Sequence, residues 1–239
     1  LLNSEATLSN IRSAMQNIAS KAKHDDTVFI YFTVHGGNKG NTTNPNCFLL
    51  PFDFNASVDN LLYEQELSNL LSTINSDRLL TVIDACHSGG AARFKSSAIN
   101  YSGIAEESLE RLSKGKGRVL FASSRDSEVS WAFGNDQNSV FTKHLILALK
   151  GCANSSDDLI RVFDIFDYLE KNVSKDAESN GKVQHPIFKA NLENNFPVAL
   201  KLGGVKGVRI SSNLDNNTIT PDRDKKLEDI LAILYPEGP

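Results

Sequence analysis

A cysteine and a histidine, each at the end of a short apolar run, are the residues of this sequence best suited to chemistry. Residues 79–83 read L-L-T-V-I, the pattern of a strand buried on both faces, and Cys86 follows shortly after them in a glycine-rich stretch. Residues 28–34 form another apolar, β-branched run, which ends at His35. Parallel strands present their carboxyl ends at one edge of a sheet, where α/β proteins bind ligands. The sequence therefore predicts a cysteine–histidine pair at that edge.

In such a pair the thiol of Cys86 is the nucleophile and the imidazole of His35 activates it. A free thiol has a pKa of about 8.5, so it needs a neighbouring base to react near neutral pH. The alternatives are that Cys86 is a buried, inert thiol and that His35 only ends a strand. His87 adjoins the thiol, but neighbouring side chains of extended chain point to opposite faces, so we expect it to face away. The remaining cysteines and histidines lack this context and are interpreted as structural: Cys47, Cys152, His24, His144 and His185.

The composition is that of a globular protein and excludes several partners. The chain has 239 residues, of which 40% are hydrophobic and 23% charged, which fits one α/β domain with a small appendage. A net charge of −4 and a pI of 5.8 give no basic surface for nucleic acid. No apolar run reaches the roughly 18 residues that a membrane span requires. Three scattered cysteines indicate a reducing compartment, and we predict a cytoplasmic location.

Hydrophobic periodicity predicts strands that alternate with helices, hence a three-layer α/β/α sandwich with a mostly parallel central sheet. The predicted helices are 8–22, capped by Thr7 or Ser9, and 62–74, 104–112, 140–149 and 159–173. The predicted strands are 28–34, 48–50, 79–83, 118–123, 187–188 and 196–200. We assign residues 1–202 to one domain and residues 203–239 to a linker-like appendage with one short helix, 227–234.

The motif around the cysteine also carries a family resemblance. His35 and a glycine follow the first strand, and D-A-C-H-S-G at 84–89 follows the second. His35 lies 51 residues before Cys86, and a caspase-type histidine lies about 50 residues before its cysteine. The sequence therefore resembles the caspase/metacaspase superfamily, specifically its bacterial metacaspase-like members. Similarity covers roughly residues 5–200, including 49–53, 118–131 and 140–150.

The resemblance implies a caspase-like fold, a cysteine endopeptidase and a set of site residues. The backbone amides of Gly36 and Cys86 correspond to the oxyanion donors. Asp84 and Thr33 correspond to positions that line a pocket for the arginine or lysine before the scissile bond. A carboxylate beside a catalytic thiol raises the pKa of that thiol, which is unfavourable unless the carboxylate binds a cation. The alternative for Asp84 is a cap for the following turn.

A further stretch, residues 123–131, resembles the segment that pairs with the substrate as an added β-strand. Its predicted substrate-binding residues are Ser123, Ser124, Asp126, Ser130 and Trp131. Trp131 corresponds to an aromatic pocket wall, and its alternative role is core packing. The resemblance thus implies a protein or peptide substrate with a basic residue before the cut.

The chain departs from the family pattern at two places. Val34 stands where the family usually has a small residue before the histidine. The strand, helix and strand that usually open the fold are absent before the helix near Thr7, which leads us to expect a missing N-terminal segment or regulatory domain and an open edge at the first strand. No metal cofactor is predicted, because no acidic cluster has the spacing of a calcium loop. Many metacaspases need calcium, so calcium dependence stays open.

Residues 93–116 form a polar, basic stretch where caspase-like enzymes carry their inter-subunit linker. We predict self-cleavage there, after Lys114 or Lys116 because glycines follow both, with Arg111 as the next candidate. The alternative is an ordinary surface loop. Two alternatives to a protease also remain, a catalytically inactive caspase-like interaction module and an acyl-transfer enzyme such as a thioesterase. A role in bacterial defence is implied by the resemblance alone.

Overall fold

A computed structural model describes residues 1–38, 46–55, 58, 60–85, 104–134, 137–153 and 157–201 of the chain. These residues contain a central β-sheet. Its described strands run in the order β1 (Thr27–Val34), β5 (Arg78–Ala85), β6 (Arg118–Ala122) and β8 (Ile187–Asn191). β1, β5 and β6 are mutually parallel, and β8 pairs with β6 in the antiparallel sense. The α/β class and the mostly parallel sheet predicted from the sequence are confirmed.

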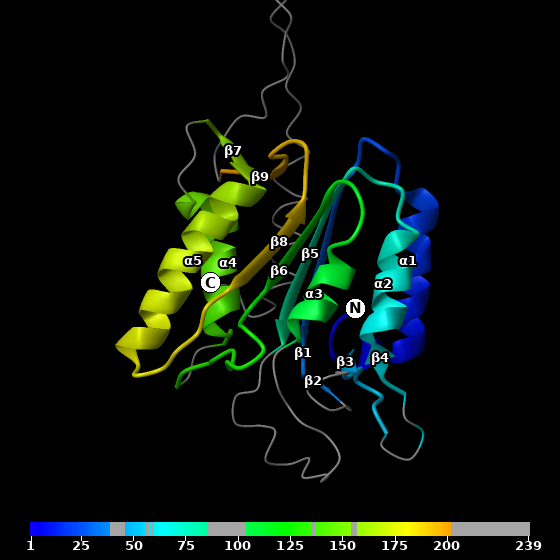
Figure 1. Ribbon diagram of the computed structural model, residues 1–239, viewed down its shortest axis with the longest axis horizontal. Helices are drawn as coiled ribbons and strands as arrows, with labels where there is room; N and C mark the ends of the chain where they lie inside the picture. Colours follow the sequence, from blue (N-terminus) through cyan, green and yellow to red (C-terminus); the bar gives the residue numbers. More distant parts are fainter. Residues whose placement is uncertain are drawn as a thin grey trace, which may run out of the picture. The chain divides into compact units, whose positions relative to one another are not determined.

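Helices cover both faces of this sheet (Figure 1). One face carries α1 (Leu8–Lys21), α2 (Glu64–Ser72) and α3 (Glu106–Leu112), and the other carries α4 (Val140–Leu147) and α5 (Val162–Ser179). β5 separates the two cores, because its side chains alternate between the faces. Leu79 and Ile83 pack on the side of α1, whereas Leu80 and Val82 pack on the side of α4 and α5. The described residues therefore form the three layers predicted.

A local sequence signal explains where α1 begins. The Thr7 hydroxyl accepts a hydrogen bond from the Asn10 N–H at 3.2 Å, which caps α1 as predicted. Leu8, Ile11 and Met15 form the buried face of this helix.

Short elements complete the described chain. They are a 3₁₀ turn (Asn3–Glu5), β2 (Gly36–Asn38), β3 (Cys47–Leu49), β4 (Leu62–Tyr63), a π-helical turn (Ala148–Cys152), β7 (Leu159–Arg161) and β9 (Pro197–Leu200).

Three of the predicted helices begin later than the periodicity indicates. The helix predicted over 104–112 begins at Glu106. The helix predicted over 62–74 begins at Glu64, because Leu62 and Tyr63 pair with β3. The helix predicted over 159–173 begins at Val162 and continues to Ser179, because residues 159–161 pair with β9. The appendage predicted over 203–239 lies outside the described residues. Among the described helices, none combines the length and apolar character needed to span a membrane.

The turn between α3 and β6 closes the end of the sheet opposite to Ala85. Gly115 and Gly117 have φ angles of +113° and +72°. A Cβ atom at Gly117 would lie 2.0 Å from the carbonyl oxygen of Asp77. Only glycine allows the chain to pass there without displacing the backbone that leads into β5.

Candidate active site

The carboxyl ends of β1 and β5 lie side by side at one edge of the sheet. The last registered pair is Val34 with Ala85. The residues that follow these two in the chain are His35 and Cys86. Cys86 and His87 lie outside the described residues, so His35 is the member of the predicted pair that the structure describes, and it is exposed. The predicted contact between the thiol and the imidazole stays a prediction.

The chain after His35 is held close to the end of β5. The His35 carbonyl accepts a hydrogen bond from the Leu50 N–H at 2.8 Å. Gly36, the predicted oxyanion donor, pairs with Leu49 in the β2–β3 ladder. A Cβ atom at Gly36 would lie 3.2 Å from the Cβ atom of Ala85. A residue without a side chain therefore lets this backbone lie against the strand that leads to the predicted nucleophile.

Asp84 is fully buried, and hydroxyl groups donate to both oxygens of its carboxylate. Ser130 donates to Oδ1 at 2.9 Å. Ser139 and Thr142 donate to Oδ2, Thr142 at 2.5 Å. Ser139 is also the N-cap of α4 and accepts the Thr142 N–H at 3.0 Å, so the carboxylate lies at the positive end of that helix. Hydroxyl donors and the helix dipole both stabilise a negative charge at Asp84.

Tyr31 extends this network from the neighbouring strand. Its hydroxyl lies 2.5 Å from Oγ1 of Thr142. Because Thr142 has a single hydroxyl hydrogen and donates it to Asp84, Tyr31 is the donor to Thr142. Thr33, the other residue of the predicted basic pocket, is exposed and stands opposite Asp84 in the register. The structure thus places Thr33 and Asp84 side by side, with Asp84 shielded from solvent.

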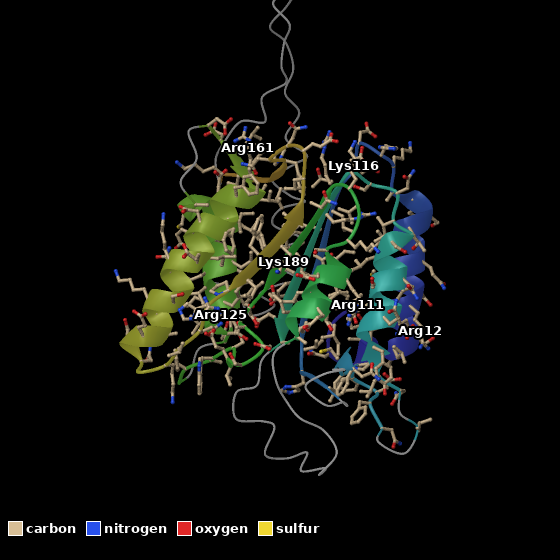
Figure 2. All side chains as sticks on the ribbon, viewed as in Figure 1. Arg12, Arg111, Lys116, Arg125, Arg161 and Lys189 are labelled. Carbon is tan, nitrogen blue, oxygen red and sulfur yellow. The ribbon has the colours of Figure 1, made fainter. Side chains whose placement is uncertain are left out.

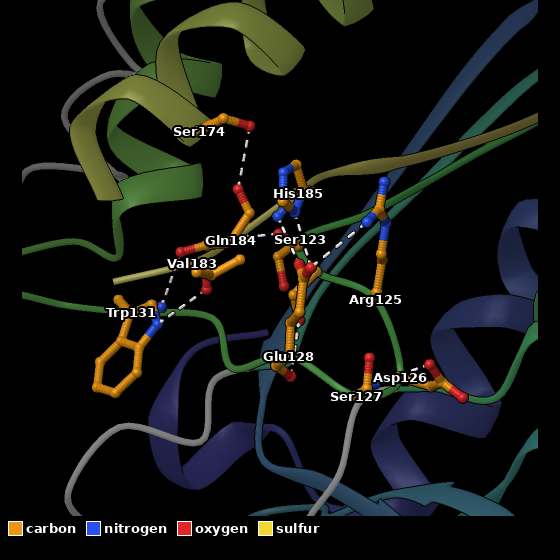
Figure 3. A network of polar contacts seen from close by, with 11 residues as sticks. Ser123, Arg125, Asp126, Ser127, Glu128, Trp131, Ser174, Val183, Gln184 and His185 are labelled. Carbon is orange, nitrogen blue, oxygen red and sulfur yellow. Dashed lines mark hydrogen bonds and ion pairs between the residues drawn. The ribbon is translucent and has the colours of Figure 1, made fainter. Parts of the chain in front are cut away.

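The predicted substrate segment, residues 123–131, is a loop that follows β6 (Figure 3). Its predicted site residues divide by exposure. The buried ones are Ser123, Ser124 and Ser130. Asp126 is exposed, and a turn closes beside it where the Glu128 N–H donates to the Arg125 carbonyl at 3.0 Å. The loop therefore contains a turn, and whether it pairs with a substrate strand stays a prediction.

Trp131 occupies the end of this loop and is half-buried. Its ring stacks on Phe133, with ring centroids 6.3 Å apart and an interplanar angle of 9°. Nζ of Lys182 lies 4.4 Å from the centroid of the Trp131 ring, a cation–π contact. Both aromatic residues also pack against the core beneath α4 and α5. Trp131 thus has the core-packing role considered above and is positioned at the edge of the loop.

The segment before β8, which no sequence motif singles out, holds this loop. The Trp131 N–H donates to Oε1 of Gln184 at 2.9 Å, and its indole N–H donates to the Val183 carbonyl at 3.3 Å. The Glu128 carboxylate accepts the His185 N–H at 2.6 Å and contacts its Nδ1 at 2.7 Å. These contacts join residues more than 50 positions apart. No periodicity or motif in the sequence marks them.

The predicted self-cleavage residues lie in two environments. Arg111 is in the last turn of α3, where its guanidinium contacts the buried Glu64 carboxylate at 2.7 Å. The hydrogen bonds that Arg111 donates to Glu64 raise the pKa of Arg111 above its ordinary value, against the effect of burial. Lys114 and Lys116 are exposed in the turn before β6. Figure 2 shows Lys116 at the end of the sheet opposite to Arg125, which lies in the loop of residues 123–131.

Each of the three histidines interpreted as structural contacts a carboxylate. The pairs are His24–Asp77 at 2.6 Å, His144–Asp176 at 3.0 Å and His185–Glu128 at 2.7 Å. Among the described residues, no group of three or more histidine, cysteine or acidic side chains is arranged to hold a metal ion. The site as described is therefore a sheet edge with an exposed histidine and a buried, hydroxyl-ringed carboxylate.

Comparison with known proteins identifies the family of this chain and supports its fold. The caspase domain matches residues 2–197. Metacaspase-7 of Arabidopsis thaliana is 22% identical over 240 residues, which cover 90% of this chain and 54% of the plant protein. The chain thus spans about half the length of this curated relative. A crystal structure of a Geobacter sulfurreducens protein has a TM-score of 0.53 at 19% identity, over 82% of this chain and 77% of that one, and it supports the fold.

The caspase-domain match covers most of the chain and includes β1, β5, β6 and the loop that follows β6. The parallel strands, the histidine after β1 and the D-A-C-H-S-G motif after β5 all fall inside it. The chain belongs to the caspase-domain family of the caspase/metacaspase superfamily.

Proposed function

We propose that this chain is a cysteine endopeptidase in which Cys86 is the nucleophile and His35 is the general base. The observation that carries the proposal is the parallel pairing of Val34 with Ala85. His35 follows Val34 in the chain and Cys86 follows Ala85, so this register favours His35 and Cys86 as neighbours. The caspase-domain match supports a protease of the caspase type, and both residues lie within the matched range.

The reaction follows from the chemistry of these groups. His35 takes the thiol proton, and the thiolate of Cys86 attacks the carbonyl carbon of the scissile bond. Backbone N–H groups of Gly36 and Cys86 stabilise the oxyanion. The imidazolium of His35 then protonates the leaving amine, and the C–N bond breaks to leave an acyl-enzyme. Water, deprotonated by His35, attacks the thioester and releases the acid product and the thiol.

Asp84 is the residue proposed to select an arginine or lysine before the scissile bond. Its carboxylate is held by hydroxyl donors and by the amino end of α4. A cation that reaches it meets a fixed, desolvated partner, which strengthens the electrostatic attraction. Because Asp84 is fully buried here, a substrate side chain reaches it only after the atoms that cover it move. Substrate binding therefore includes a local opening of the site.

The test is cleavage of fluorogenic peptides that differ at the residue before the cut, with and without calcium. We expect cleavage after Arg and Lys, and complete loss in Cys86→Ala. All variants carry Cys152→Ser, because Cys152 is exposed and would react with thiol reagents, whereas Cys47 is buried. Asp84→Asn should reduce cleavage of basic peptides far more than it reduces alkylation of Cys86. If the Cys86→Ala protein still cleaved the peptides, the proposed nucleophile would be refuted. If Asp84→Asn reduced cleavage and alkylation equally, Asp84 would be a structural residue.

We also propose self-cleavage after Lys114 or Lys116, carried out by a second molecule. Both lysines are exposed, but their turn adjoins the amino end of β6, whereas the proposed nucleophile follows the carboxyl end of β5. β5 has eight residues, so these ends are separated by about 23 Å along the strand. Arg111 is a poorer candidate, because it lies in a helix and contacts Glu64.

The order of the reaction tests this proposal. Intermolecular cutting should make the initial rate rise with the square of the protein concentration. Cys86→Ala protein should be cut at the same site when active protein is added, and Lys114→Gln with Lys116→Gln should abolish the cut. A first-order rate that does not depend on dilution would refute the intermolecular route.

A further inference from the structure

Gln184 is a buried amide that contacts both ends of the loop formed by residues 123–131. Its Nε2 donates to the Ser123 carbonyl at 2.9 Å and to Oγ of Ser130 at 3.3 Å. Its Oε1 accepts the Trp131 N–H at 2.9 Å. The side chain is 1% exposed, so these contacts are shielded from water. One residue outside the loop therefore fixes the distance between the point where the loop leaves β6 and the point where it ends.

The backbone partners fix the orientation of this amide. A backbone N–H only donates, so the atom that faces Trp131 must be the amide oxygen. A carbonyl only accepts, so the atom that faces Ser123 must be the amide nitrogen. In the flipped amide, the nitrogen would face the Trp131 N–H, another donor, and the oxygen would face the Ser123 carbonyl, another acceptor. The nitrogen therefore also faces Ser130, and the Ser130 hydroxyl is the acceptor of that bond.

The orientation of Gln184 in turn directs the hydroxyl hydrogen of Ser130. Since Ser130 accepts from Gln184, its hydrogen is available to Oδ1 of Asp84, 2.9 Å away. A directed chain of hydrogen bonds thus runs from Gln184 through Ser130 to Asp84. The Ser174 hydroxyl donates to the Gln184 carbonyl at 3.1 Å and anchors this chain to α5.

We propose that Gln184 is a positioning residue for recognition of the basic substrate side chain, acting through Ser130 on Asp84. This inference rests on the proposed function and adds a residue that touches neither the substrate nor the reacting atoms. Gln184 holds Ser130 where its hydroxyl orients the Asp84 carboxylate. The neighbouring Glu128–His185 contact secures the middle of the same loop. Loss of the Gln184 donor should therefore weaken binding of a basic side chain without slowing the chemical step.

The experiment is Gln184→Glu in the Cys152→Ser background, assayed with an arginine peptide. Glutamate keeps the length of the side chain and an acceptor for the Trp131 N–H, but it cannot donate to Ser130. Ser130 then shares its hydrogen between two carboxylates, so we expect KM to rise about tenfold or more with kcat nearly unchanged. Alkylation of Cys86 should keep its rate. Gln16→Glu, on the exposed face of α1, is the matched charge control and should leave KM unchanged.

A double variant tests whether Gln184 acts through Ser130. Ser130→Ala alone should also raise KM, and Gln184→Glu added to it should raise KM no further. If thermal unfolding shows that Gln184→Glu does not fold, Gln184→Met replaces it, because Met keeps the volume and lacks the donor. Additive effects on KM, or an unchanged KM in a folded variant, would overturn the positioning role. Absence of basic-peptide cleavage in the unsubstituted protein would instead overturn the proposed function.

Discussion

Thr142→Val removes the hydroxyl that links Tyr31 to Asp84 while nearly preserving the shape of the side chain. Thr142 is buried, and it donates to Asp84 at 2.5 Å and accepts from Tyr31 at the same distance. A hydrogen bond to a charged group contributes about 1.5–3 kcal/mol. The half-buried Tyr31 hydroxyl also loses its acceptor, which costs about 1 kcal/mol at most because water can replace it. We therefore expect a loss of about 1.5–4 kcal/mol in the free energy of unfolding.

Two companion variants separate the links of this chain. Thr142→Ser keeps the hydroxyl and should lose less than about 1 kcal/mol, and Tyr31→Phe removes only the outer donor and should lose about 1 kcal/mol. Urea unfolding gives the free energies, and the melting temperature of Thr142→Val should fall by about 5–10 °C. Tyr31→Phe should cost little once Thr142 is already Val. A loss below about 0.5 kcal/mol for Thr142→Val, or strict additivity of the two substitutions, would refute the assigned hydrogen-bond chain.

Further predictions concern other contacts. Burial acts to raise the pKa of Asp176, but hydrogen bonds from Lys143 and His144 outweigh it and hold that pKa below the ordinary value. The stability that ionised Asp176 contributes is therefore complete above about pH 4 and is lost as the pH falls further. Asp176→Asn should be less stable at pH 7 and should show a smaller loss of stability on acidification, measured by urea unfolding across pH. Glu64→Gln should lower the free energy of unfolding by about 1–2 kcal/mol, because Glu64 is buried while its partner Arg111 is partly solvated. Glu66→Gln, which loses an exposed contact to Arg12, should lower it by less than about 1 kcal/mol. Gly117→Ala should cost well over 2 kcal/mol in thermal unfolding, because its Cβ atom would meet Asp77, while Gly181→Ala, with a similar φ and open space, should cost about 1 kcal/mol. Equal losses at the two glycines would contradict the steric argument.

The parts of the fold that the sequence predicts are those with strong local signals. The apolar runs that became β1 and β5 are bounded by polar residues, and the Thr7 cap precedes a clear helical period. The register of those two strands, which brings the predicted site residues to one edge, follows from the usual behaviour of parallel strands. The site prediction at His35 and Asp84 depended on this regularity and on the cysteine motif.

The parts that the sequence does not predict depend on distant partners. Leu62 and Ile160 fit a helical period as well as a strand, and only pairing with β3 and β9 decides between the two. Thr142 lies 58 positions from Asp84, and Gln184 lies 61 positions from Ser123. A buried glutamine without a periodic context carries no local sign of its partners. These contacts could be seen only once the strands had brought the segments together.

The position of Asp84 on β5 has a consequence for the rates at which the site's parts move. β5 is paired on both sides and its side chains are almost entirely buried, so its amide hydrogens should exchange with solvent only when the whole domain unfolds. The loop of residues 123–131 has few backbone hydrogen bonds to other elements and depends largely on side-chain contacts, so it should open locally at a lower free energy. We therefore expect the carboxylate to stay fixed on a long timescale while the loop around it opens and closes many times. Under the proposed function, the loop would then adapt to different peptides, and the strand that carries Asp84 would set the preference for charge.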